Sequence, residues 1–190
     1  MTRAPHSETR NPTPFLSDVT TLRDRARKFV DRGAVDAAYV GDVKQTIDIL
    51  QAVLATELVC VLRYTQHSIA ATGLASESVA EEFAQHAREE MEHAHSVAKR
   101  INQLGGVPDL DPKGLAGRSA SQYVTSANLT EMIRENLVAE RIAVDHYREL
   151  VRFFADNDPT TRLLIESILA VEEEHASDML DLLSVHGPKE

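Results

Sequence analysis

The sequence has a single cysteine, no tryptophan and few aromatic residues, which make up 5% of its 190 positions. One cysteine, Cys60, cannot form a disulfide within the chain, so a disulfide-stabilised fold is excluded and a reducing compartment is expected. No uninterrupted apolar run reaches the roughly 18 residues that a membrane-spanning helix requires. The first residues also lack the apolar middle of a signal peptide. We therefore expect a cytoplasmic protein without a membrane partner.

Positive charge is also scarce. The chain has 20 Lys and Arg against 30 Asp and Glu, which gives a formal net charge of −10. This balance argues against a generally basic nucleic-acid-binding surface, and it suits a protein that handles cations. The basic cluster Arg23–Lys28 is an exception. It is either a solvated helix face or a contact for nucleic acid or another partner.

The residues that are abundant, such as Ala, Leu, Glu, Val and Arg, favour helices. Apolar residues recur at steps of three and four, as in Ile47, Leu50 and Leu54, and no strand-like alternation is present. Capping residues, glycines and prolines mark where helices begin and end. Four long helices are predicted, over about residues 42–72, 76–104, 128–155 and 158–185.

The lengths of the connections predict how these helices pack. The first two helices are joined by a few residues, and so are the last two, whereas residues 105–127 separate the second from the third. This pattern predicts an all-α four-helix bundle with one long crossover between helices two and three. The bundle is expected over residues 42–186. Residues 1–41 form an N-terminal extension that is partly flexible and has a short helix within residues 18–32, and residues 187–190 form a tail.

Two glutamates lie within otherwise apolar helical stretches. Glu57 is found in LATELVCVL, and Glu140 in NLVAERIAV. A carboxylate on the core face of a helix must be paired or bind a metal, because an isolated buried charge is very costly. Glu57 and Glu140 are therefore candidate core ligands.

The second and fourth helices each carry a Glu-x-x-His pair, Glu90 with His93 and Glu172 with His175. Side chains three residues apart project to one side of a helix. Both pairs lie about as far from their hairpin turns as Glu57 and Glu140 do, so all six groups can share one level of the bundle. One pair could be an accident of an acidic helix, but two pairs matched by two core glutamates indicate a site for two divalent ions.

This pattern resembles the ferritin-like superfamily of di-iron carboxylate proteins, and within it the bacterioferritins and related Dps-like ferritins, over about residues 44–183. TELVCVLRYTQH looks like a bacterioferritin first helix, and EEMEHAHSVAKRINQLGGVPDL resembles the second helix and the start of the crossover. LVAERIAVDHYREL and AVEEEHASDML resemble the third and fourth helices. The resemblance implies di-iron ligands, with Glu90 and Glu172 bridging: Glu57, Glu90, His93, Glu140, Glu172 and His175.

The implied activity is that of a ferroxidase, which oxidises Fe(II) to Fe(III) with O2 or hydrogen peroxide. The product would be stored as mineral inside a hollow homo-oligomer, protecting against oxidative stress. The N-terminal extension and the short segment after the fourth helix resemble shells of twelve subunits more than shells of 24. Iron is the expected metal, with manganese as an alternative.

Three other functions stay open. The first is a di-metal peroxidase or Mn-catalase-like enzyme, although rubredoxin-type electron transfer is disfavoured because Cys-x-x-Cys pairs are lacking. The second is a Dps-type shell that protects DNA through the N-terminal extension. The third is a structural bundle whose buried ionic groups bind no metal.

Several residues near the expected ligands have secondary roles. Tyr64 lies seven residues after Glu57, where it either packs in the core or serves the site by hydrogen bonding or electron donation. Met91 occupies the position that resembles the haem-ligating methionine of bacterioferritins, with plain packing as the alternative. His86 is a candidate for an outer iron site, and Cys60 is expected in the core. The residues expected on the surface are Glu89, Glu92, His95, His67, His146 and His186.

Overall fold

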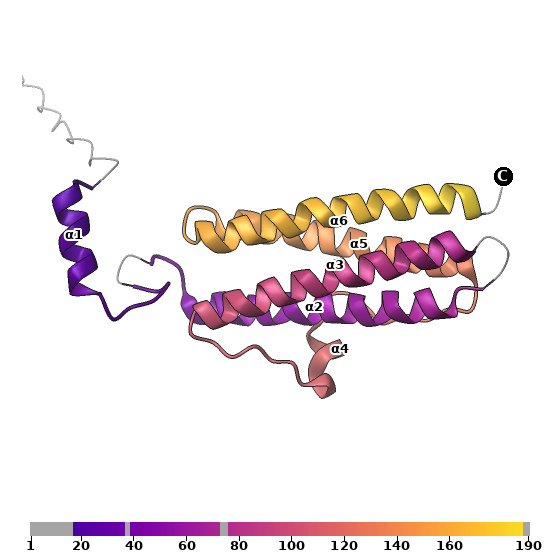
Figure 1. Ribbon diagram of the computed structural model, residues 1–190, viewed down its shortest axis with the longest axis horizontal. Coiled ribbons are helices and arrows are strands. Elements are labelled where there is room, and N and C mark those ends of the chain that lie inside the picture. The colour runs from indigo at the N-terminus through magenta and orange to yellow at the C-terminus, as the bar shows by residue number, and fades with distance from the viewer. Residues whose placement is uncertain (1–16, 37–38, 73–75, 188–190) are drawn as a thin grey trace, which may run out of the picture.

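The computed structural model describes residues 17–36, 39–72 and 76–187, and within these ranges the regular structure is entirely helical. Four long helices lie side by side along one axis (Figure 1). They are α2 (Val43–Ala70), α3 (Ser76–Gln103), α5 (Leu129–Phe154) and α6 (Pro159–His186). The predicted all-α four-helix bundle is thereby confirmed, with helix ends close to those expected.

The sequence begins and ends these helices with identifiable signals. Asp42, Asn128 and Asp158 each accept a hydrogen bond from the backbone N–H three residues later, as N-capping residues do. Pro159 follows Asp158 at the first position of α6, where its missing N–H costs nothing. After α3, Gly105 has a φ of 87°, a left-handed conformation that glycine adopts without a steric penalty.

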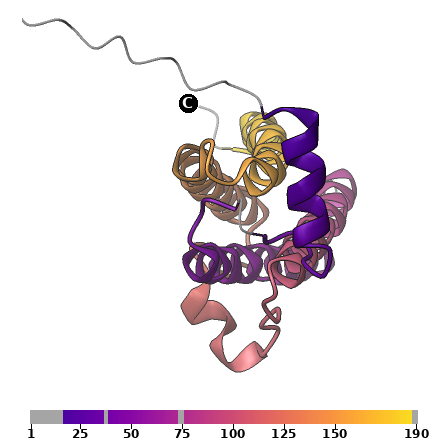
Figure 2. The same ribbon diagram turned by 90° about the vertical axis from the view of Figure 1, so that its left-hand side faces the viewer.

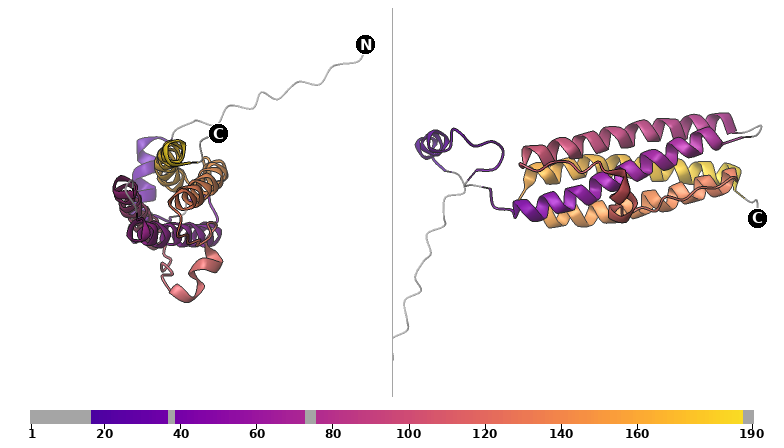
Figure 3. Two further views of the ribbon diagram at one scale, coloured as in Figure 1. Left: turned by 90° about the vertical axis from the view of Figure 1, so that its right-hand side faces the viewer. Right: turned by 90° about the horizontal axis from the view of Figure 1, so that it is seen from below.

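The helices form two hairpins, α2 with α3 and α5 with α6, joined by a crossover along the outside of the bundle (Figures 1 and 3). The crossover makes α3 and α5 run in the same direction. It contains a 3-10 turn, Pro112–Gly114, and a short helix α4 (Leu115–Arg118), neither of which the sequence patterns predicted. Leu115 packs against Ala55 and Val59 of α2, so the crossover is fastened to the bundle.

The N-terminal segment contains a helix α1 (Val19–Lys28), which has no buried residue. It lies beyond one end of the bundle (Figures 1 and 2). The chain rejoins the bundle at Tyr39, whose side chain packs against the core and whose hydroxyl donates to Asp158 Oδ2 at 2.8 Å. Residues 1–16, which include the part expected to be flexible, and residues 188–190 of the tail lie outside the described residues.

Among the described residues, two large apolar clusters fill the interior with a polar layer between them, in addition to the small cluster around Leu115. One cluster includes Leu54, Ile101 and Phe154, and the other includes Phe83 and Met132. All of these side chains are buried. The bundle therefore encloses its ionisable residues at mid-height, with packed apolar layers on both sides.

Helix α2 is long and apolar enough to span a membrane, because it has 28 residues and its most apolar stretch of 18 residues has a mean hydropathy of 1.5. The sequence patterns had not predicted this. Half of its most apolar stretch is buried inside the bundle, and the helix also buries Glu57 and Arg63. Such burial is what the core helix of a bundle requires.

Candidate metal centre

Four carboxylates and two imidazoles meet in the polar layer. Each helix of the bundle contributes at least one of them. Five are almost fully buried, and the sixth, His93, keeps 11% of its side chain exposed. The structure thus brings together all six residues that the sequence singled out: Glu57, Glu90, His93, Glu140, Glu172 and His175.

The six side chains form two overlapping groups of four. One contains Glu57 and His93, the other Glu140 and His175, and both include Glu90 and Glu172. Within each group, potential ligand atoms lie within 4.8 Å of one another. Two ions, one in each group, would therefore share the carboxylates of Glu90 and Glu172.

Both histidines turn the same ring nitrogen toward this centre. His93 Nδ1 lies 3.1 Å from Glu172 Oε1 and 3.2 Å from Glu57 Oε2. His175 Nδ1 lies 3.5 Å from Glu172 Oε2 and 4.0 Å from Glu140 Oε2. Each half of the centre therefore presents one nitrogen and several carboxylate oxygens.

Burial and mutual repulsion give these groups unusual protonation. Burial, with the nearby Glu90, raises the pKa of Glu57 to about 8, and burial with Glu172 raises the pKa of Glu140. Burial alone would lower the pKa of His93, but its carboxylate neighbours outweigh burial and raise it to about 12. The same balance raises the pKa of His175 to about 11. Without metal, bound protons therefore neutralise much of the charge.

Several buried polar atoms of the centre lack a hydrogen-bond partner. They are Glu90 Oε1, Glu140 Oε2, both carboxylate oxygens of Glu172, and His175 Nδ1. Buried polar atoms are rarely left unpaired, and an ion that the structure does not include is a common reason when they are. The oxygen and nitrogen donors fit divalent iron or manganese.

A tyrosine from the opposite hairpin donates to each core glutamate. Tyr64 of α2 donates to Glu140 Oε1 at 2.5 Å, and Tyr147 of α5 donates to Glu57 Oε1. Tyr64 was expected to serve the site from the face of Glu57, and the structure pairs it with Glu140. Tyr147 was missed, although it follows Glu140 by seven residues as Tyr64 follows Glu57. That repeated spacing was the available signal.

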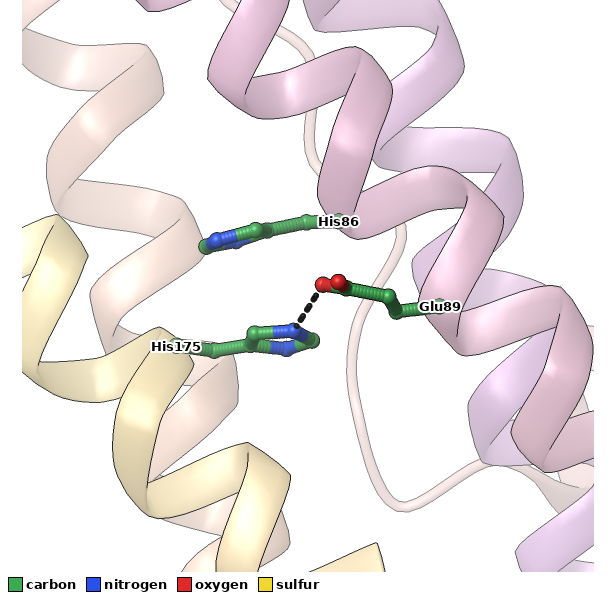
Figure 4. A group of neighbouring side chains, drawn as sticks. All are labelled: His86, Glu89 and His175. Carbon is green, nitrogen blue, oxygen red and sulfur yellow. Dashed lines mark hydrogen bonds and ion pairs between the residues drawn. The ribbon is translucent and has the colours of Figure 1, made fainter.

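Glu89, which was expected on the outside, lies against the centre. Its Oε2 is 2.9 Å from His175 Nε2 (Figure 4). As an acceptor it keeps a proton on Nε2, so Nδ1 is the nitrogen that faces the centre and would bind a metal. The side chain of Glu89 is still 34% exposed, so the expected exterior position holds in part. The contact with His175 was missed because Glu89 reaches across from α3 to α6.

His86 is buried beside the centre. Its ring stacks on His175 with 3.9 Å between centroids (Figure 4), and its Nδ1 is 3.2 Å from the Tyr64 hydroxyl. Burial, with the neighbouring His175, lowers the pKa of His86 to about 3. His86 thus contacts His175 of the centre and Tyr64, which donates to Glu140, without belonging to either group of four.

The remaining candidates lie elsewhere. Met91 borders an apolar groove between α2, α3 and the crossover, with Leu62 and Leu110. Cys60 is buried as expected, and burial raises the pKa of its thiol. His67 was expected on the surface, but it is fully buried against Phe83.

Comparison with known proteins places this geometry in a family. The ferritin-like domain family, named Ferritin, matches residues 47–185. A nutrient stress-induced DNA-binding protein of Synechococcus is 30% identical over 71% of this chain and 78% of its own length. The DNA protection during starvation protein of Pyrococcus furiosus is 29% identical over 86% of both chains.

A solved structure agrees. It is the bacterioferritin-related protein of Bacteroides fragilis, which is described as a dodecameric thioferritin. The match has a TM-score of 0.73 and 36% sequence identity, and it covers 76% of this chain and 88% of that chain. The family match spans nearly all of the bundle, including all six residues of the centre. The chain therefore belongs to the ferritin-like domain family.

Proposed function

We propose that the chain is a cytoplasmic ferroxidase that oxidises Fe(II) and stores the Fe(III) product. The observation that carries this proposal is the pair of overlapping donor groups that share Glu90 and Glu172. Unpaired acceptor atoms on both shared carboxylates support it. Family membership supports iron handling or DNA protection in general.

In this proposal two Fe(II) ions are the substrate, and the six side chains hold them close together. Four carboxylates balance the charge of two divalent ions. Each Fe(II) gives up one electron. The two electrons, with two protons, reduce O2 to hydrogen peroxide or reduce hydrogen peroxide to two water molecules. Tyr64 and Tyr147 act as positioning residues, because their hydroxyls fix the orientation of Glu140 and Glu57.

Storage requires an enclosed space, which a single bundle lacks. We propose a hollow homo-oligomer of twelve chains, supported by the likeness to the dodecameric protein of Bacteroides fragilis. The acidic balance of the chain, −10 in formal charge, would favour entry of Fe(II) into such a shell.

Aerobic addition of Fe(II) to the metal-free protein, followed by ultraviolet absorbance, tests the proposal. We expect rapid oxidation that continues far beyond about two irons per subunit, with the product staying soluble. The double variant Glu90→Ala/His93→Ala should lose the rapid phase. Glu92→Ala/His95→Ala is the matched control, because this pair has the same spacing on α3 but both residues are exposed.

Other outcomes would favour a different chemistry. Oxidation that stops at about two irons per subunit would indicate a catalytic di-metal protein without storage. Oxygen evolution from peroxide by the manganese form, without mineral, would indicate a catalase-like enzyme. Rapid oxidation that survives Glu90→Ala/His93→Ala would contradict the proposed centre.

A second candidate function is DNA protection, because two relatives carry names that refer to DNA. The observation on this chain is α1, which exposes Arg23, Arg25, Arg27 and Lys28. DNA binding that weakens steeply with salt and disappears on removal of residues 1–33 would support it. Unchanged binding after that removal would contradict a role for α1.

A further inference from the structure

After α4 the crossover continues without regular secondary structure and passes over α2 (Figure 3). Residues 120–124 form a strap whose backbone groups need partners outside any helix or sheet. Side chains of α2 provide two of these partners. The Ala120 N–H donates to Thr56 Oγ1 at 2.9 Å, and Arg63 Nη1 donates to the Gln122 carbonyl at 3.1 Å. The strap is therefore fastened to α2 at two points.

His67 is a third residue of α2 that faces the strap. It follows Arg63 by four residues, so both side chains lie on one side of the helix. His67 is 0% exposed, and its ring packs on that of Phe83 of α3 with 5.9 Å between centroids. Asn136 of α5 and the backbone of Val124 are the polar groups beside the ring. Neither ring nitrogen is placed for a good hydrogen bond with a described residue, so the ring fills the space between three helices and the strap.

Arg63 places a permanent positive charge next to this ring. Arg63 is only 1% exposed, and a guanidinium keeps its proton at any ordinary pH. Its hydrogen bonds go to uncharged groups, which are Asn136 Oδ1 at 2.8 Å, the Gln122 carbonyl and Cys60 Sγ at 3.5 Å. The charge of Arg63 is therefore not neutralised by these contacts, and it acts on His67.

This environment keeps the His67 ring neutral while the strap is in place. Burial, and then the charge of Arg63, lower the pKa of His67. The other residues that face the ring, on α3, α5 and the strap, carry no charge; they are Phe83, Asn136 and Val124. If the strap moved away, water would reach the ring and its pKa would return to about 6.5. Because the released form takes up a proton more readily, closure of the strap loses stability as pH falls below about 6.5.

The other half of the bundle lacks most of this polar row. An offset of 83 residues relates α2 to α5, as it relates the two core glutamates. With this offset, two of the three strap-facing residues of α2 correspond to apolar residues of α5. The pairs are Thr56 with Ala139, Arg63 with His146, and His67 with Leu150. Packing of the four helices therefore does not require the row, and its contacts with the strap are what distinguish α2.

We propose that His67 is an acid-sensitive latch, whose protonation releases the strap from α2 and admits water to Arg63 and Asn136. Arg63 directly precedes Tyr64, and Asn136 lies one turn before Glu140. Release would therefore open the side of the bundle next to the hydrogen bond between Tyr64 and Glu140. The latch follows from the contacts of the strap and does not depend on the proposed function.

Cys60 can report release of the strap. It is the only cysteine of the chain, it is 2% exposed, and its Sγ contacts Arg63 Nη2. The test is the rate at which 4,4′-dithiodipyridine labels the full-length assembled protein at about pH 7.5 and about pH 5, on either side of the pKa of an exposed histidine. Each rate is divided by that of glutathione at the same pH. We expect this ratio to be about ten-fold higher at the lower pH, since each unit below about 6.5 shifts the equilibrium by up to ten-fold.

Variants assign the effect to His67. His67→Gln and His67→Leu stay neutral at both pH values and should abolish the rise; the second copies the matching residue of α5. His146→Gln is the matched control, because His146 is another partly buried histidine with a lowered pKa, and it should keep the rise. Thr56→Val removes the acceptor of the Ala120 N–H and should speed labelling at both pH values.

A wild-type ratio that does not change with pH would overturn the latch, as would a rise that survives both His67 variants. A rise that accompanies loss of helical circular dichroism or of the mass of the assembly would also overturn it, because labelling would then report global unfolding or dissociation. Failure of the proposed ferroxidase activity would leave these readings unaffected, since none of them involves a metal.

Discussion

At the scale of single residues, Glu57 and Glu140 determine the behaviour of the metal-free protein. Both are buried among other carboxylates, and both have raised pKa values for that reason. A carboxyl group that stays protonated avoids the cost of a buried charge. The same group must lose its proton to bind a metal. Raised pKa values therefore oppose metal binding by Glu57 and Glu140 until those protons are displaced.

The substitution Glu140→Gln distinguishes the role of Glu140 in the metal-free protein from its role in metal binding. Burial and the neighbouring carboxylates raise the pKa of Glu140 and so favour its protonated form without metal. A neutral amide that still accepts from Tyr64 should therefore change the free energy of unfolding of the metal-free protein by no more than about 1 kcal/mol. The substitution should nevertheless abolish most of the stabilisation that added Fe(II) or Mn(II) gives. Thermal unfolding with and without metal measures both effects. Glu149→Gln, exposed on the same helix, should leave both unchanged.

Metal binding should also release protons. Metal-free His93 and His175, with pKa values of about 12 and 11, are protonated at neutral pH, and so is Glu57 with its pKa of about 8. A metal must displace these protons, so affinity should rise with pH between about 6 and 8 and fall on acidification. Calorimetry in buffers of different ionisation enthalpy should report roughly two to four protons released per subunit. Binding that is independent of pH would contradict this account.

The same raised histidine pKa values affect the stability of the metal-free fold. An unfolded histidine has a pKa of about 6.5, so the stabilisation from protonated His93 and His175 is fully present below that pH. It declines as pH rises toward their folded values of about 12 and 11. The stabilisation from protonated His93 and His175 should therefore persist in acid and weaken in alkali.

At the scale of elements, the N-terminal segment divides into two parts. Helix α1 buries nothing, whereas Tyr39 contacts the core and donates to Asp158, which caps α6 and pairs with Arg100 at 2.9 Å. Removing residues 1–33 should leave the unfolding midpoint unchanged. Removing residues 1–41 should cost about 1–2 kcal/mol, since a buried hydrogen-bond partner is lost. Equal midpoints for the two truncated proteins would contradict this division.

Most of the fold and of the candidate centre could be predicted because each depends on local spacing. The steps of three and four residues predict the helices, and equal distances from a hairpin turn bring Glu57 level with Glu90. Helix α4 could not be predicted, because four residues are too few for a periodic pattern. The contact of Glu89 was missed and His67 was misplaced because their surroundings come from helices distant in sequence, so their own helical periodicity does not reveal what they contact.

At the scale of the whole molecule, the isolated bundle exposes apolar surface that an assembly would cover. The groove that Met91 borders also contains Leu62 and Leu110, whose side chains are 52% and 60% exposed. Contiguous exposed apolar surface of this kind often marks a contact with another protein. Association of chains would bury this apolar groove. A closed assembly would also create the enclosed space that storage requires.

The mass of the assembly tests this arrangement. Twelve chains of 21.0 kDa would give about 250 kDa, and 24 chains about 500 kDa. We expect the smaller mass by light scattering after size-exclusion chromatography, because the chain resembles a dodecameric protein over most of its length. Leu62→Glu should reduce the mass, since a charge in the groove opposes its burial between chains. A species of about 500 kDa would contradict the twelve-chain shell, and a wild-type monomer would leave the Fe(III) product no enclosed space, so oxidised iron should then precipitate.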